Sequence, residues 1–395
     1  MTSRRLVLTR SAAVIGAAST GLLLPEIVRA QSGKVRVGFM LPYTGTFAQL
    51  GVAIENGFRM AINEQGGKLG GREIEYFKVD DESEPSKGIE NASKLVQRDK
   101  VDVLVGTVHS GVQMGIQKVA RDSGVLSLIP NAGVHAATRS LCAPNVFRTS
   151  FTNSQPTRAL GKAMYDRGAK TAVWITWKYA AGDEAYEGFK EGYTAAGGKI
   201  IKELGLPFPQ VEFQALLTEI AALKPDAVAC FFAGGGAAKF IKDYAAAGLK
   251  GKIPLYGSGF LTEGVLDAAG PAADGIVTTM HYSDSLPTVR NGQFRLNYAK
   301  TFKLQPDVYA VQGYDTGLLL IQGANAVKGD LNNKPALYKA MEGAVVDSPR
   351  GKWTMSKSHN PVQDIYLRVV EKGENKVIGV AAKALADSGA GCKMG

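Results

Sequence analysis

The sequence predicts an α/β protein made of two doubly wound parallel-sheet lobes, joined by a hinge of three chain crossings. Short β-branched or aromatic runs alternate with longer amphipathic runs from Val35 onward, which is the pattern of parallel sheets covered by helices. The short runs are almost continuously apolar, as strands buried on both faces must be. The alternation stops near Val146 and restarts at Thr171, so we expect two such lobes.

The elements follow in order along the chain. Strands are predicted at 35–40, 73–80, 101–106 and 125–129 in the first series, and at 171–177, 199–204, 227–232, 253–256 and 275–280 in the second. Helices are predicted between them at 50–64, 85–98, 111–122, 155–167, 183–196, 213–223 and 237–247.

The chain changes character after Met280. Helices are predicted at 285–301, 309–327 and 334–342, and antiparallel strands at 350–355, 364–371 and 375–381. We place the three crossings near residues 149–153, 279–284 and 346–350. With the crossings at these positions, residues 31–149 and 281–346 form the first lobe, and residues 150–280 and 347–395 form the second.

The first 30 residues have the features of a signal peptide. Arg4, Arg5 and Arg10 precede a short apolar run, Ala12–Leu24, and a small-x-small pattern ends at Ala30. The run is too short to span a bilayer. We therefore expect export to the periplasm with cleavage after Ala30, by the general or the twin-arginine route, since the paired arginines also fit the latter.

The composition excludes several classes of function. Lys and Arg number 46 against 36 Asp and Glu, a formal net charge of +10, but the basic residues are scattered and form no nucleic-acid-binding stripe. The four histidines are dispersed and predict no metal site. The run at Gly234 lacks the remainder of a phosphate loop. We expect a monomer that binds no nucleic acid and needs no cofactor or metal.

The three cysteines are expected to differ in role. Cys230 lies in an apolar strand and is expected to be a buried free thiol. Cys142 and Cys392 lie in loop and tail sequence, and an exported chain meets an oxidising compartment. We predict that these two form a disulfide that ties down the C-terminus; three free thiols are the alternative.

The ligand site is expected where strands lead into helices. In open parallel sheets, ligands bind beyond the carboxyl ends of the strands, where helix N-termini present unpaired N–H groups. Backbone amides at Ser110 and Gly133, with the Ser110 hydroxyl, could hold a carboxylate. The junctions at 42–51, 107–111, 130–133, 177–182, 233–236 and 256–260 share small residues, hydroxyls and aromatics, which suit a small, partly apolar molecule with one anionic end.

In their order and spacing these segments resemble the leucine/isoleucine/valine-binding family of periplasmic binding proteins, which have the type I fold. The resemblance extends from Val35 to about Ala381. It is carried by Leu41-Pro-Tyr-Thr-Gly-Thr-Phe-Ala-Gln-Leu-Gly, Asn63-Glu-Gln-Gly-Gly-Lys-Leu-Gly-Gly-Arg, Gly106-Thr-Val-His-Ser-Gly, Pro130-Asn-Ala-Gly and Val308-Tyr-Ala-Val-Gln-Gly-Tyr-Asp. It implies the substrate-binding component of an ABC importer, which closes its lobes on a ligand and docks on membrane permease subunits without catalysis.

The resemblance also assigns roles by position. Leu50 stands where the family often has an aromatic residue, Ser110 where it binds the ligand carboxylate, and Tyr309 where it has an aromatic wall. Ala132 and Gly133 match a segment that supplies backbone groups, and Tyr179 and Gly234 match loops that close over the ligand. The candidate ligand-binding residues are therefore Tyr43, Phe47, Leu50, His109, Ser110, Ala132, Gly133, Tyr179, Phe232, Gly234, Ser258, Gly259 and Tyr309.

One departure from the family indicates the ligand class. Amino-acid binders of this family place an acidic residue after the Gly of the loop that matches Tyr256-Gly257, whereas this chain continues with Ser258-Gly259-Phe260. An ammonium buried without a countercharge costs several kcal/mol. Glu263, a few residues further on, could substitute for the missing acid, but the helix pattern would let it point to solvent. We therefore predict an aromatic acid of the benzoate, hydroxybenzoate or cinnamate type, as in the aromatic-acid-binding branch that the composition resembles.

Other functions remain open alternatives. A branched-chain or other amino-acid binding protein is the nearest one. An enzyme is a distant one, because the sequence contains no nucleophile elbow and no full dinucleotide fingerprint; we therefore predict no enzymatic activity. A sensor ligand domain on the same fold is equally distant, because no signalling domain is recognisable.

Overall fold

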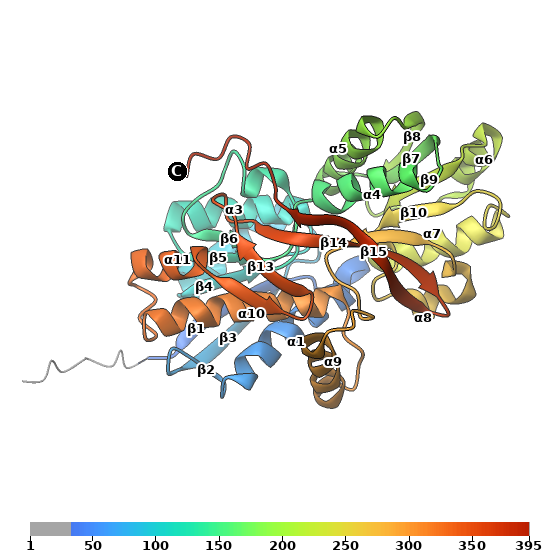
Figure 1. Ribbon diagram of the computed structural model, residues 1–395. Coiled ribbons are helices and arrows are strands. Elements are labelled where there is room, and N and C mark those ends of the chain that lie inside the picture. The colour runs from blue at the N-terminus through green and yellow to red at the C-terminus, as the bar shows by residue number, and fades with distance from the viewer. Residues whose placement is uncertain (1–32, 395) are drawn as a thin grey trace, which may run out of the picture. The chain divides into compact units, whose positions relative to one another are not determined.

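A computed structural model describes residues 33–394, so the predicted signal peptide and its cleavage site lie outside the described residues. This part of the chain contains two β-sheets with helices packed on them (Figure 1). None of its helices is long and apolar enough to span a membrane.

The first sheet is parallel except at one edge, where β2 is antiparallel to β3. Its strands, in spatial order, are β2 (Lys68–Leu69), β3 (Arg72–Asp80), β1 (Val35–Leu41), β4 (Val103–Gly106), β5 (Leu126–Ile129) and β6 (Val146–Arg148). The helices that follow β1, β3 and β4 are α1 (Ala48–Glu64), α2 (Gly88–Ser93) and α3 (Ser110–Ser123). The residues of β4 and β5 are all buried, as the continuous apolar runs predict.

The second sheet has a parallel part and an antiparallel part. The parallel strands, in spatial order, are β11 (Val277–Met280), β10 (Leu255–Ser258), β9 (Ala227–Phe231), β7 (Thr171–Lys178) and β8 (Lys199–Pro207). The antiparallel strands are β12 (Val345–Ser348), β13 (Gly351–Met355), β14 (Pro361–Glu371) and β15 (Glu374–Leu385). The accompanying helices are α4 (Ser154–Asp166), α5 (Ala180–Ala195), α6 (Gln214–Leu223), α7 (Gly234–Ala246) and α8 (Leu266–Ala269).

In the sequence, three further helices follow β11 and precede β12: α9 (Val289–Phe302), α10 (Val308–Ala326) and α11 (Lys334–Glu342). Helix α10 packs closely against α1 (Figure 1). A Cβ on Gly57 would lie 1.9 Å from the carbonyl oxygen of Ala310, and one on Gly313 would lie 1.9 Å from that of Ile54. Only glycine permits such an approach, which fixes the start of α10 beside the first sheet.

The predicted two-lobe α/β fold is confirmed, and most predicted elements are present. The sequence did not reveal β2 or β12, and the polar extended stretch near Val146 is a true strand, β6. The chain passes between the two groups of elements after β6, after β11 and before β12. The exact residue boundaries of the lobes stay a prediction.

The C-terminal segment is fixed by a disulfide and a buried carboxylate. Cys142 and Cys392 form a disulfide with Cα atoms 5.5 Å apart, and Cys230 is a buried free thiol. Asp387 accepts from Arg139 Nη2 at 2.7 Å and from Thr152 Oγ1 at 2.8 Å. Burial alone would raise the pKa of Asp387, but the bonds from Arg139 and its neighbours lower it to about 2.

We expect Cys392→Ser to lower the free energy of unfolding by about 2–5 kcal/mol, because the bridge closes a long loop in the unfolded chain. Denaturant unfolding of the oxidised protein measures this. Reducing agent should destabilise the original protein by a similar amount and leave Cys392→Ser unaffected. Equal stability of the oxidised protein and the variant would contradict the expectation.

Candidate ligand-binding site

A cavity lies where loops from both groups of strands meet. Its lining comes from the ends of β1, β4, β5, β6, β7, β9 and β10 and from the start of α10. The residues that line it are Phe47, Leu50, Val108, Ser110, Asn131, Gly133, Phe151, Asn153, Tyr179, Ala181, Phe231, Ala233, Phe260 and Tyr309. None of them is charged.

The sheet topology explains why the cavity forms here. In the first sheet β1 lies between β3 and β4, and in the second β7 lies between β8 and β9. The connections from β1 and β4, and those from β7 and β9, therefore run in opposite directions and leave a crevice beyond the carboxyl ends of the strands. The loops that follow these four strands supply more than half of the lining.

One end of the cavity is polar. Helix α3 begins at Ser110, where the backbone N–H groups of a first helical turn have no intrahelical partners. The Asn153 Nδ2 lies 3.3 Å from Ser110 Oγ. A Cβ on Gly133 would lie 2.2 Å from Asn153 Oδ1 and 2.7 Å from Phe151 Cε2. Ser110, Gly133 and Asn153 therefore form one compact group of neutral polar atoms, the polar end.

The loop that carries Gly133 is held by a buried arginine. Arg148 is fully buried, and its guanidinium donates to the carbonyl oxygens of Ala132 at 3.1 Å and Val134 at 2.5 Å. Thr138 and Asn360 accept its remaining bonds. Backbone carbonyls and neutral side chains thus accept the hydrogen bonds of this guanidinium, so Arg148 has a structural role without an ion pair within residues 33–394.

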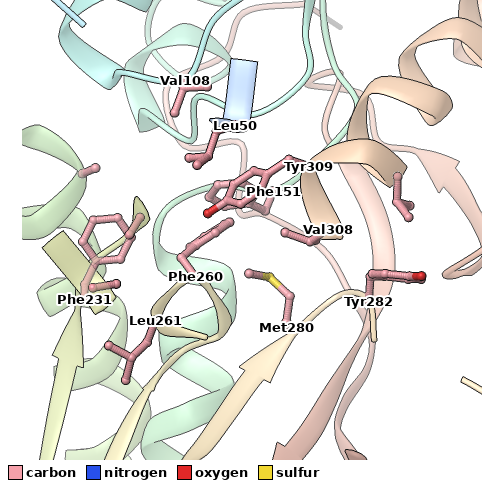
Figure 2. Close-up of a cluster of buried hydrophobic side chains, with 14 of the residues drawn as sticks. Leu50, Val108, Phe151, Phe231, Phe260, Leu261, Met280, Tyr282, Val308 and Tyr309 are labelled. Carbon is pink, nitrogen blue, oxygen red and sulfur yellow. The ribbon is translucent and has the colours of Figure 1, made fainter. Parts of the chain in front are cut away.

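The rest of the cavity is largely aromatic (Figure 2). The ring of Phe260 lies 4.7 Å from that of Phe151, 6.1 Å from that of Phe231 and 6.0 Å from that of Tyr309, between centroids. Tilted and edge-on aromatic contacts at these distances are favourable. These walls suit a flat apolar group.

Six of the predicted residues line the cavity, and they come from both groups of strands: Phe47, Leu50, Ser110, Gly133, Tyr179 and Tyr309. Seven predicted residues do not line it: Tyr43, His109, Ala132, Phe232, Gly234, Ser258 and Gly259.

The side chains of two of these seven residues, Tyr43 and His109, interact with residues outside the cavity or behind its lining. The Tyr43 hydroxyl donates to Glu55 Oε2 at 2.7 Å, and Lys78 lies over its ring. His109 caps α3 by accepting from Gly111 N–H at 3.1 Å, and its ring stacks behind Tyr179. Burial lowers the pKa of His109 to about 4, so this cap is neutral at pH 7.

The other five are displaced by backbone geometry. Phe232 points into the core, because side chains alternate along an extended chain and its neighbour Phe231 takes the cavity side. Ala132 N donates to Thr107 O. A Cβ on Gly234 would lie 2.5 Å from Thr46 O, so this glycine lets two loops approach each other. Ser258 and Gly259 are buried at the end of β10, where Arg368 packs on Gly259.

Sequence reasoning missed eight lining residues or named them without committing to them: Val108, Asn131, Phe151, Asn153, Ala181, Phe231, Ala233 and Phe260. Most stand one or two positions from a predicted residue. Phe151 and Asn153 follow β6, and treating that segment as a plain crossing hid them. Recognising it as a strand would have identified its end as part of the site.

Glu263 does not point to solvent, contrary to the sequence-based expectation. It is buried, forms an ion pair with Arg368, and accepts from Val308 N–H at 3.0 Å. Its charge is therefore compensated by Arg368, and the residue lies outside the cavity lining.

A second carboxyl group lies behind the polar end. Glu184 of α5 accepts from Asn153 Nδ2 at 2.8 Å and from His135 N–H at 2.9 and 3.0 Å. It thereby ties α5 to the loop that follows β5. Burial raises the pKa of Glu184 to about 7, against the opposing effects of these donors and of Arg148 and Arg139.

The residues from 33 to 394 contain no group of three or more His, Cys, Asp or Glu side chains that could hold a metal ion. The chemistry that the described cavity offers is binding: neutral donors at one end, aromatic walls elsewhere, and loops from two lobes around the space between them.

Comparison with known proteins gives consistent matches over most of the chain. A family profile described as "Periplasmic binding protein" matches residues 34–375. The Leu/Ile/Val-binding protein homolog 6 of Brucella abortus is 28% identical over 354 residues, which are 88% of this chain and 90% of that protein.

Two solved structures are similar in both sequence and fold. One is an ABC transporter solute-binding protein from R. palustris in complex with benzoate. It is 53% identical, with a TM-score of 0.89, over 91% of this chain and 100% of that one. The other is a solute-binding protein of an ABC transporter from Rhodopseudomonas palustris BisB5 in complex with 3,4-dihydroxybenzoic acid. It is 31% identical, with a TM-score of 0.85, over 90% and 99% of the chains.

The raised pKa of Glu184 predicts a pH-dependent contribution to stability. The folded state keeps the proton up to about pH 7, whereas the unfolded state loses it near 4.5, so this contribution is greatest at low pH and falls as the pH rises between these values. The stability of the protein relative to Glu184→Gln should therefore fall by on the order of 2 kcal/mol between pH 5 and pH 8.

Denaturant unfolding at the two pH values measures this difference. Glu191→Gln, on the same helix and ion-paired with Arg158 at the surface, is the matched control and should show little pH-dependent difference. If the difference in free energy of unfolding between the protein and Glu184→Gln were the same at both pH values, the pKa of Glu184 would not be raised in the folded state.

Proposed function

Because this chain belongs to the periplasmic binding protein family, we propose that it captures a small aromatic carboxylate in the periplasm by closing its two lobes. We further propose that it delivers this acid to the permease subunits of an ABC importer. The observation that carries the proposal is the cavity itself: aromatic walls, one polar end built from neutral donors, and no charged residue among those that line it. The ligands of the two similar solute-binding proteins support the same class.

The polar end suits a carboxylate. Ser110 offers a hydroxyl and stands at the first turn of α3, where the helix dipole favours negative charge. Gly133 offers a backbone group in a loop that Arg148 holds rigid. Hydrogen bonds to an ionised acceptor are about twice as strong as neutral ones, so a few neutral donors suffice for one carboxylate.

The aromatic walls suit a benzene ring. Phe151 follows β6 at a crossing and Tyr309 begins α10, whereas Tyr179, Phe231 and Phe260 come from the ends of β7, β9 and β10 in the second sheet. Burying a ring between such surfaces yields both the hydrophobic contribution and specific aromatic contacts. A ring held on both sides makes contacts with both lobes at once.

An amino acid fits this cavity poorly. Its ammonium group would enter a space that no acidic residue lines. Glu263 forms its ion pair with Arg368, and Glu184 lies behind Asn153, from whose amide it accepts a hydrogen bond, and does not line the cavity. An uncompensated charge in such a site costs several kcal/mol. This argument disfavours the branched-chain amino-acid alternative.

The arrangement implies binding by closure. A ligand that rests on Ser110 and Gly133 gains contacts with Tyr179 and Ala181 only when the lobes are together, so its affinity for the closed form is higher and it shifts the population toward that form. The closed form is then the one that the permease subunits recognise. We propose that a signal peptide cleaved after Ala30 directs export, and that the protein acts as a monomer without catalysis, cofactor or nucleic acid.

A ligand screen tests the class of ligand. We expect benzoate and hydroxybenzoates to raise the melting temperature and leucine, isoleucine and valine to leave it unchanged, because only the acids lack an ammonium group. Differential scanning fluorimetry followed by calorimetry measures both. Stabilisation by leucine without any by aromatic acids would overturn the proposal.

A single methyl group in the polar end should weaken binding. Gly133→Ala places a Cβ 2.2 Å from Asn153 Oδ1 and 2.7 Å from Phe151 Cε2, so both side chains must move. We expect the Kd for benzoate to rise at least about 10-fold, as for the loss of one good hydrogen bond to a charged group. Gly292→Ala, whose Cβ would meet nothing within 4 Å, is the control. Equal affinity of the two variants would place the anion elsewhere.

A further inference from the structure

The Tyr309 hydroxyl has no hydrogen-bond partner within residues 33–394, although the side chain is only 1% exposed. Three other buried tyrosines of this part of the chain have hydrogen-bond partners for their hydroxyl groups. Tyr193, Tyr244 and Tyr282 donate to Ala169 O, Ile253 O and Asn291 Oδ1 at 2.9–3.0 Å. A buried hydroxyl without a partner is costly, so an exception calls for an explanation from function.

The hydroxyl faces the cavity. Tyr309 lines it, and Figure 2 shows the hydroxyl directed away from α10, toward the space that Leu50, Phe231 and Phe260 border. Tyr282 belongs to the same cluster but bonds elsewhere. The unpartnered donor is therefore aimed at the position where the proposed ligand would lie.

We place the Tyr309 hydroxyl at the end of the cavity that lies away from the polar end. The Cβ position of Gly133 touches Phe151, Phe151 packs on Phe260, and Phe260 packs on Tyr309. Tyr309 is thus two ring-to-ring contacts removed from Phe151, the side chain that Gly133 approaches. An acid whose carboxylate is held at Ser110 and Gly133 would present the opposite edge of its ring to the tyrosine.

We propose that the Tyr309 hydroxyl bonds to a hydroxyl group at the ring position opposite the carboxylate, so that the site prefers 4-hydroxybenzoate to benzoate. The proposal rests on the binding of an aromatic acid proposed above. Burial raises the pKa of Tyr309 well above its ordinary value, so the hydroxyl is a neutral donor at pH 7. A site built to bond a ligand hydroxyl discriminates against the analogue that lacks it.

The test is a set of dissociation constants measured by calorimetry with benzoate, 2-hydroxybenzoate and 4-hydroxybenzoate. A neutral hydrogen bond in such a site corresponds to about a 3- to 10-fold difference in affinity. We expect 4-hydroxybenzoate to bind more tightly than benzoate by this factor. The 2-hydroxy isomer has the same atoms but places its hydroxyl beside the carboxylate, so it should show no such gain.

In Tyr309→Phe the ratio of the two dissociation constants, benzoate over 4-hydroxybenzoate, should fall to about one. Tyr338→Phe removes the other buried tyrosine hydroxyl that lacks a partner, and Tyr338 does not line the cavity. In this matched control the ratio should stay at its original value.

Three results would overturn the inference. They are equal binding of benzoate and 4-hydroxybenzoate by the original protein, an equal gain for the 2-hydroxy isomer, and a ratio that Tyr309→Phe leaves unchanged. The first two need no variant, so a folding defect in Tyr309→Phe cannot hide the outcome. Failure of every aromatic acid to bind would instead overturn the proposed function.

Discussion

Three fully buried arginines hold the loops that carry the site, and most of the binding geometry depends on them. Arg148 holds the loop around Gly133. Arg350 donates to the carbonyl oxygens of Thr149 at 2.7 Å and Ser150 at 3.3 Å, directly before Phe151, and pairs with Asp315. Arg368 donates to Gly259 O, directly before Phe260, and pairs with Glu263, which accepts from the N–H of Val308. Each guanidinium thus fixes the backbone next to a lining residue.

This use of arginine has a physical reason. Loops at the ends of parallel strands lack ladder partners for their carbonyl groups, and buried carbonyls need donors. A guanidinium supplies five N–H groups in a rigid planar fork and keeps its charge when buried. Removing one partner from such a buried network costs far more than a surface ion pair, about 3–5 kcal/mol. The cavity itself can then remain free of charge, because the charges that shape it lie one layer behind.

The sequence predicted the fold well because its signals are local. Alternating apolar and amphipathic runs located almost every strand and helix, and the switch-point rule indicated which loops matter. Ser110, Gly133 and Tyr179 follow from that rule alone. The predictions that were wrong concern residues whose environment is set by contacts distant in the sequence or by the exact end of a strand. Glu263 lies 105 positions from Arg368, so its burial is invisible in a helical pattern, and the choice between Phe231 and Phe232 depends on where β9 ends.

In the uncharged cavity, affinity for a carboxylate and selectivity among different acids depend on different residues. In the function that we propose, the polar end bonds the carboxylate that every candidate acid shares, so it contributes affinity without choosing among the acids. The choice among acids must then come from the rest of the lining, which is largely apolar and includes the unpartnered Tyr309 hydroxyl. An apolar wall distinguishes ligands weakly, by the size of what it excludes, whereas an unpartnered buried donor distinguishes them by what they offer in return. On the selectivity that we propose, the choice depends on one side chain of α10, whose position is set by the glycine contacts that hold α10 against α1.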